Sequence, residues 1–153
     1  MPLPPFQTTL EQHRDAVARF LVASVGPQEA EDCLQETMIA ALRAYRRLPS
    51  GSNVRAWLLA IARNKAVDAH RSRGRRPLPV AEPNPGSTSA PDGADDELWD
   101  AVRTLPPKQR AAVVLRYVND LPHRDIARVL ECSEPAARRS LHAGLENLRK
   151  EWT

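Results

Sequence analysis

The sequence lacks several features on which whole classes of protein depend. It has only two cysteines, 5% aromatic residues and no long hydrophobic run in 153 residues. Two distant cysteines favour the reduced thiols of a cytosolic protein over a disulfide framework. The missing run of about 18 apolar residues argues against a transmembrane helix. The first residues combine no basic start with an apolar core, so we expect no secretory signal.

Strand patterns and catalytic constellations are also missing. No stretch alternates apolar and polar residues as a half-buried strand does. The four histidines, His13, His70, His123 and His142, are scattered, and no Cys/His spacing is typical of a metal site. We find no nucleophile–base pair and no glycine-rich phosphate loop. The sequence therefore predicts an all-α protein without metal or cofactor, and an enzyme is the least favoured function class.

Helical periodicity covers most of the chain. Apolar residues recur at helical spacing over residues 9–25, 28–47 and 54–71, and again over 96–104 and 108–117. In the second helix, the positions predicted to face inward are Leu34, Met38, Ala41, Leu42 and Tyr45. The polar residues on its other face are equally typical of a solvated helix surface.

A linker divides the chain. Residues 77–95 are rich in proline, glycine and serine and have no periodicity, which predicts a flexible segment. It joins two small helical domains, residues 6–76 and 96–153. Lys and Arg exceed Asp and Glu by five over residues 1–76, whereas residues 77–96 carry four acids and no base. Basic domains on either side of an acidic segment favour a nucleic-acid partner.

A helix-turn-helix pattern lies between Leu121 and Lys150. The Glu131-Cys132-Ser133 turn has the expected length, Ser133 suits an N-cap, and Pro135 falls in the first turn of the second helix. That helix presents Arg138, Arg139 and His142 near its start, where a recognition helix meets bases and phosphates. A plain helical hairpin with solvated arginines fits the same residues, so this pattern alone leaves both readings open.

Motifs in both domains resemble those of bacterial extracytoplasmic-function sigma factors, which consist of regions two and four only. AEDCLQETMIAALRAYRRL, residues 30–48, resembles the region-two pattern A-E-D-L-V-Q-E-T-F-x-x-A-W. VRAWLLAIARNKAVDAHRSRGRR, residues 54–76, is similar to W-L-x-x-I-A-R-N-x-x-x-D-x-x-R-x-x-R-R. In the second domain, LPPKQR, DIA and SEPAARRSLH resemble region-four signatures in the family's order.

The resemblance implies roles for polar residues in both domains. Asp32, Gln35 and Glu36 match the helix that docks on the clamp helices of the RNA polymerase largest subunit, where acids can pair with arginines. The minus-ten element, melted by capture of extruded bases, would be contacted by Asn53, Asn64, Asp68, Arg71, Arg73, Arg75 and Arg76. The minus-thirty-five element would be contacted by Ser133, Arg138, Arg139 and His142.

The second domain also departs from the family pattern. Glu131 stands where the turn usually has glycine, which implies strain if the residue is left-handed. Gly144 lies inside the recognition helix and costs about 1 kcal/mol relative to alanine. Ala143 and Leu145 occupy positions that are basic in the family, so we expect fewer phosphate contacts.

The leading interpretation is an alternative sigma factor in the cytoplasm. It would bind core RNA polymerase and promoter DNA and direct promoter-specific transcription initiation. An anti-sigma factor is a possible partner, and we expect no insertion into a membrane. The alternative is a sigma-like adaptor that binds polymerase or a regulatory protein without recognising a promoter. A free-standing helix-turn-helix repressor is a third reading, against which the polar face around Asp32 and Gln35 argues.

Overall fold

In this computed structural model, the described backbone comprises residues 3–75 and 93–152, and the described side chains are those of residues 3–72 and 97–150. Within these ranges every regular element is a helix, which confirms the all-α prediction. The order is α1 (Phe6–Val25), α2 (Pro27–Ala44), the 3-10 turn η1 (Tyr45–Arg47), α3 (Val54–Arg75), α4 (Gly93–Thr104), α5 (Pro107–Tyr117), α6 (His123–Leu130) and α7 (Glu134–Trp152). Of the predicted linker, residues 77–92 lie outside the described residues, and α4 begins at Gly93.

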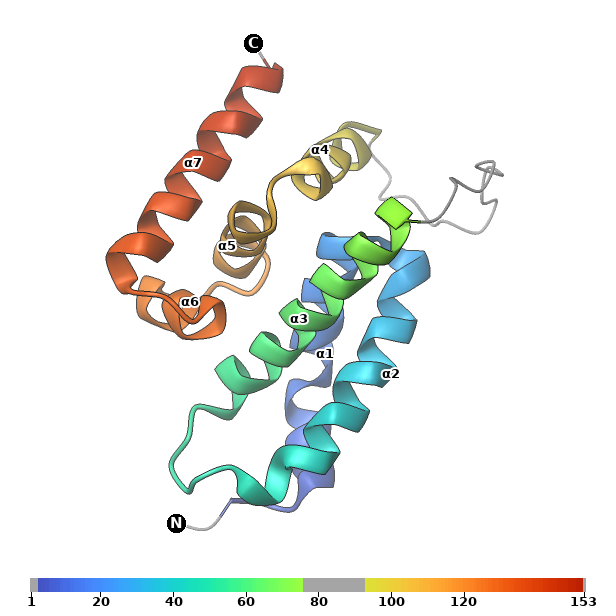
Figure 1. The fold of residues 1–153 in the computed structure, drawn as a ribbon, viewed down its shortest axis with the longest axis vertical. Helices are drawn as coiled ribbons and strands as arrows, with labels where there is room; N and C mark the ends of the chain where they lie inside the picture. The colour runs from blue at the N-terminus through green and yellow to red at the C-terminus, as the bar shows by residue number, and fades with distance from the viewer. Residues whose placement is uncertain (1–2, 76–92, 153) are drawn as a thin grey trace.

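The first three helices form a bundle in which each contacts the other two (Figure 1). Gly26 connects α1 to α2 with a φ of 90°, a backbone conformation that glycine adopts without strain, and Pro27 then starts α2. Phe20 and Leu21 of α1 and Leu58 of α3 are almost fully buried. None of the described helices is both long and apolar enough to cross a membrane.

The inward face of α2 differs from the prediction at Leu42, whose side chain is 59% exposed. The buried stripe of α2 is Cys33, Thr37 and Ala41, spaced four residues apart, and the Thr37 hydroxyl donates to the Cys33 carbonyl oxygen at 2.7 Å. Leu42 lies one residue, about 100°, beyond this stripe, so it turns away from both α1 and α3. Periodicity alone favoured burying every leucine, which is why this prediction was wrong.

Arg110 organises the start of the second bundle. Its side chain is only 5% exposed, and its guanidinium donates to the carbonyl oxygens of Arg103 at 3.2 Å and Leu105 at 3.1 Å. These oxygens lie at the end of α4, where no helical N–H follows to satisfy them. Burial lowers the pKa of Arg110 from its usual value, and the guanidinium still bonds as a cation. The arginine of the LPPKQR motif therefore fixes the bend between α4 and α5.

The helix-turn-helix comprises α6, a short turn and α7. Glu131 adopts the left-handed conformation with φ 55° and ψ 46°, as its position in the turn predicted. The Ser133 hydroxyl accepts a hydrogen bond from the Ala136 N–H at 3.2 Å, so Ser133 is the N-cap of α7, and Pro135 lies in its first turn. These three sequence predictions are confirmed.

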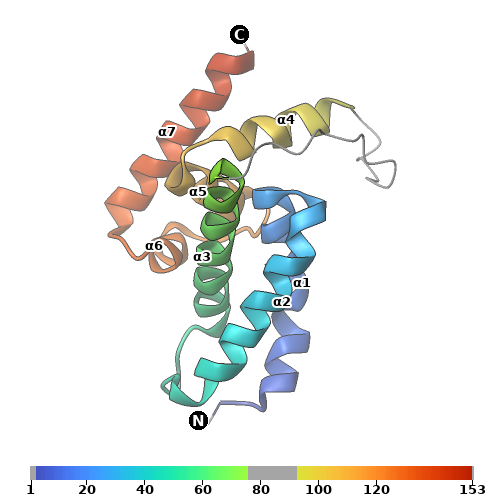
Figure 2. The ribbon, with the colours of Figure 1, turned by 45° about the vertical axis from the view of Figure 1, so that its right-hand side comes forward.

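The two bundles pack against each other, with α3 against α6 and α1 against α4 and α5 (Figure 2). The Asn119 side-chain amide donates to the Ala16 carbonyl oxygen of α1 at 2.9 Å and is only 2% exposed. Arg55 of α3 donates to the Asn119 carbonyl oxygen at 3.1 Å, and Asn53 donates to the Asp125 carboxylate at 3.3 Å. Buried side chains of both bundles therefore form one continuous cluster.

Gly144 marks a close approach of two helices. A Cβ at this buried position would lie 2.9 Å from Cγ2 of Val113 and 3.3 Å from the Gln109 carbonyl oxygen. The glycine that weakens α7 as an isolated helix therefore allows α7 to pack closely on α5.

We predict that Gly144→Ala destabilises the protein, because overpacking costs about 1–3 kcal/mol and outweighs the gain of about 1 kcal/mol in helix propensity. The free energy of unfolding, measured by urea denaturation, should fall by about 1 kcal/mol. In a Val113→Ala background the same substitution should cost less, because the nearest side-chain atom is gone. Stabilisation in the otherwise native chain would contradict the packing explanation.

We also predict that Asn119→Ala loosens the contact between the bundles. The substitution removes a buried amide that donates to Ala16, a loss of about 1–2 kcal/mol. The radius of gyration from small-angle X-ray scattering should therefore increase. The matched control is Asp120→Asn, an exposed neighbour whose positive φ asparagine tolerates, and it should leave the radius unchanged.

Candidate functional site

The predicted docking residues lie together on the outer face of α2. Asp32, Gln35 and Glu36 are all exposed. The same face continues at helical spacing through Ile39 and Leu42, which are 51% and 59% exposed. Exposed apolar side chains beside polar ones are typical of a protein-binding surface. Sequence reasoning overlooked Ile39 and placed Leu42 inside, so it missed the apolar part of this face.

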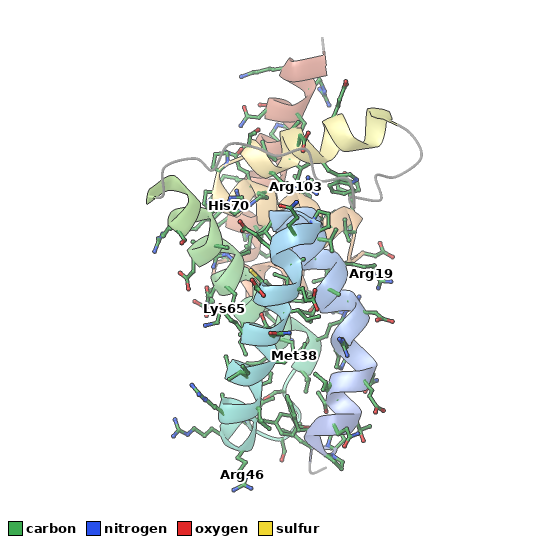
Figure 3. All side chains as sticks on the ribbon, turned by 90° about the vertical axis from the view of Figure 1, so that its right-hand side faces the viewer. Arg19, Met38, Arg46, Lys65, His70 and Arg103 are labelled. Atoms are coloured by element: carbon green, nitrogen blue, oxygen red, sulfur yellow. The ribbon has the colours of Figure 1, made fainter. Side chains whose placement is uncertain are left out.

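An acidic pocket of about 350 Å³ lies between α2 and α3. Asp32, Glu36 and Asp68 line it together with Lys65, which Figure 3 shows on α3 beside α2. Asp68 was predicted to contact promoter DNA, but the structure groups it with the docking carboxylates. Carboxylates repel phosphates and attract a basic side chain, so this pocket suits a protein partner better than a DNA backbone.

The exposed ridge of α3 carries the other region-two residues. Asn64, Asp68 and Arg71 are exposed and follow one another at helical spacing, as predicted. On the side of α3 that faces away from α2, Arg71 also lines a groove between α3 and the second bundle. Arg73 and Arg75 belong to the α3 backbone, but their side chains, like the whole of Arg76, lie outside the described residues.

Asn53 has two structural contacts. Its side-chain oxygen accepts a hydrogen bond from the Ala56 N–H at 3.1 Å, which caps the N-terminus of α3. Its side-chain amide donates to Asp125 on α6 at 3.3 Å. While the bundles are packed together, the amide group of Asn53, which was predicted to contact a base, is therefore bonded to Asp125 of the second bundle.

Three of the predicted minus-thirty-five residues, Arg138, Arg139 and His142, are exposed on α7. Arg138 forms an ion pair with Glu134 at 3.0 Å, and His142 lies 3.1 Å from Glu146. Exposed pairs of this kind on a helix contribute less than about 1 kcal/mol, so phosphates can replace the carboxylates. Ser133 is also exposed, although its hydroxyl already caps α7.

Three further basic side chains lie near Arg138. Arg116, His123 and Arg124 line a pocket of about 450 Å³ with Arg138 and Glu134. His123 and Arg124 are the first residues of α6, and the first helix of a helix-turn-helix crosses the DNA backbone. That position in the motif is the signal that could have identified them.

Metal binding receives no support from the described part of the chain, where no three His, Cys, Asp or Glu side chains form a group that could hold an ion. Cys33 is buried and Cys132 is partly buried, and neither forms a disulfide. The candidate surfaces consist of charged and hydrogen-bonding side chains and, on α2, of exposed apolar ones.

Family models match both bundles. The model for Sigma-70 region 2 matches residues 9–76, and the model for Sigma-70, region 4 matches residues 95–148. Two solved structures share the fold. The first is the sigma factor RpoE in complex with the anti-sigma factor NepR from Bartonella quintana, with a TM-score of 0.76 and 24% identity, covering 97% of this chain and 96% of that one. The second is CnrH in complex with the cytosolic domain of CnrY, with a TM-score of 0.73 and 22% identity, covering 96% of this chain and 86% of that one.

Sequence relatives extend over nearly the whole chain. The RNA polymerase sigma factor CarQ of Myxococcus xanthus is 33% identical, with coverage of 95% of this chain and 87% of CarQ. The ECF RNA polymerase sigma factor SigD of Mycobacterium tuberculosis is 32% identical, covering 93% and 74%. The chain spans 61% of the length of a third relative, the ECF sigma factor SigE of Mycolicibacterium smegmatis, which is 31% identical over 96% of this chain. Both region models and these relatives show that the chain belongs to the family of extracytoplasmic-function RNA polymerase sigma factors.

Proposed function

We propose that this chain binds core RNA polymerase and directs promoter-specific transcription initiation in the cytoplasm. The observation that carries the proposal is the separation of two kinds of surface. An acidic and apolar face lies on α2, whereas arginines gather on α3 and on the helix-turn-helix. The first kind suits a protein partner and the second suits DNA. The role is binding without a chemical step of its own.

The α2 face would dock on the clamp helices of polymerase. Ile39 and Leu42 would supply apolar area at the centre, and Asp32 and Glu36 would pair with arginines at the edge. Asp68 adds a further carboxylate from α3 through the shared pocket. An apolar centre with a polar rim is the usual composition of a specific interface.

Promoter recognition would use the two bundles at separate places. Asn53, Asn64 and Arg71 would hold the minus-ten strand, while Arg138 would read a guanine of the minus-thirty-five element with Arg116, Arg124 and Arg139 on phosphates. These elements lie roughly 80 Å apart along B-form DNA, at 3.4 Å per base pair. We therefore infer that the packed bundles separate on a promoter, which also releases Asn53 from Asp125.

The proposed partners are core RNA polymerase, promoter DNA and an anti-sigma factor. The sigma-like adaptor without promoter recognition remains the alternative. The basic side chains that gather around Arg138 support promoter recognition, since they suit DNA phosphates and an adaptor would not need them. A run-off transcription assay separates the two, because an adaptor would bind core polymerase and yield no transcript from any selected promoter.

We predict that Asp32→Ala combined with Gln35→Ala weakens binding to core polymerase by about tenfold, because two contacts at the rim of the apolar centre are lost. Fluorescence anisotropy with labelled protein measures the change. The matched control is Gln12→Ala with Asp15→Ala, which removes the same side-chain types from the exposed face of α1. Equal affinities for both double variants would remove the α2 docking assignment.

We predict that Arg138→Ala lowers initiation from minus-thirty-five-dependent promoters by an amount equivalent to about 1–3 kcal/mol, because a bidentate contact to guanine is lost. Run-off assays should compare a selected promoter with versions substituted at single upstream bases. The loss should be concentrated at one base pair. A uniform loss over all sequences would instead identify Arg138 as a phosphate contact.

A further inference from the structure

A largely apolar pocket of about 350 Å³ lies where α4 passes the C-terminal end of α1 (Figure 2). We call it the α1–α4 pocket. Its lining includes Ala18, Val22 and Ala23 of α1, Trp99 of α4, and the two arginines Arg19 and Arg103. The volume falls within the range of about 300–1,000 Å³ that is typical of small-molecule sites. The pocket shares no residue with the surfaces assigned above to polymerase or DNA.

The apolar part of the lining suits a flat ring. Val22 is 40% exposed, and the Trp99 indole is only partly buried although it packs against the core. An aromatic ring stacks on an indole at an offset and buries apolar area on both partners. The planar guanidinium of an arginine stacks on such rings as well. A ligand with a flat apolar body would therefore use most of this lining.

The charge of the pocket is positive, because Arg19 and Arg103 line it and no carboxylate does. Arg103 is held in place by a bond from its guanidinium to the Val22 carbonyl oxygen at 3.1 Å and by a 3.2 Å ion pair with Asp100, whose side chain is 76% exposed. Its Nε–H is buried without an acceptor. Arg19 is exposed and pairs with no described residue. A bound anion would thus gain two cationic partners.

The size of the pocket restricts the ligand further. About 350 Å³ accommodates roughly a dozen non-hydrogen atoms, since one water molecule takes about 30 Å³ of liquid. A helix of a partner protein, about 10 Å across, is too large, and a phosphate ion would leave the apolar lining unused. We propose that the α1–α4 pocket binds a small aromatic carboxylate, with its ring against Trp99 and Val22 and its carboxylate paired with the two arginines. This site goes beyond the proposed function and does not rest on it.

The test uses the full chain and two soluble probes with the same ring and opposite charge, 2-naphthoate and naphthalen-2-ylmethylammonium. Binding is followed by NMR through the indole N–H of Trp99, which is identified by its absence from a Trp99→Phe variant. We expect 2-naphthoate to shift this resonance with a dissociation constant of about 1 mM or below, and the ammonium probe to bind at least about tenfold more weakly. Equal binding of the two probes, or no saturable shift by 2-naphthoate, would overturn the proposal.

The position of the carboxylate is tested with Arg19→Gln. Arg19 is exposed, so its substitution disturbs no packing, and we expect about tenfold weaker binding of 2-naphthoate because one of two cations is lost. Figure 3 shows Arg103 close to the end of α1 and Arg19 farther along the same helix. The matched control is Arg14→Gln, which makes the same charge change at an exposed position of α1 outside the pocket and should leave the affinity unchanged. Equal losses in the two variants would contradict a carboxylate site at Arg19.

Two further measurements test the fit of the ring. Ala18→Leu adds apolar volume to the pocket wall without a change of charge, so 2-naphthoate should bind about tenfold more weakly, and an unchanged affinity would place the ligand elsewhere. Decanoate carries the same charge on an aliphatic chain of similar size, and we expect it to bind more weakly than 2-naphthoate. Tighter binding of decanoate, with the same sensitivity to Arg19→Gln, would overturn the aromatic ligand in favour of a fatty acyl chain.

Discussion

The hydrogen bond from Asn119 to the Ala16 carbonyl oxygen joins the two halves of this protein. A buried amide N–H without an acceptor costs about 1–3 kcal/mol, so breaking this bond while the bundles stay packed is unfavourable. Asn119 follows α5, and its side-chain NH2 group donates to α1 while its Oδ1 atom is buried without a partner, so the single bond fixes how α5 lies against α1. The contacts of Arg55 and Asn53 with the second bundle depend on that arrangement.

Helix α3 separates surfaces of opposite charge. On one side it shares the acidic pocket with α2, and on the other its Arg63 and Arg71 line a groove between the bundles together with Lys108 and Arg139. A single helix can do this because residues three or four apart share a face and intermediate residues point elsewhere. The two oppositely charged surfaces therefore lie within about one helix diameter of each other.

Much of the fold could be predicted from the sequence, because helix periodicity, Gly26-Pro27 and the Ser133 cap are local signals. The polar identity of the α2 face was predictable for the same reason. The exposure of Leu42, the pairing of Asn53 with Asp125 and the grouping of Asp68 with Asp32 were not. Each depends on how helices distant in the chain pack, and hydrophobicity at one position carries no information on that. Gly144 is a further example. Its low helix propensity can be read from the sequence, whereas the close packing on α5 that it allows can be seen only in the structure.

The contact between the bundles is intramolecular, which gives it a kinetic meaning. Two modules on one chain meet at an effective concentration set by their linker, about millimolar where the linker is short and flexible, so contacts too weak to join separate molecules can still pair them. Any partner that binds only one bundle's inner face must wait for a transient opening. The association rate of this protein with such a partner would then be set by how often the Asn119 contact breaks rather than by diffusion.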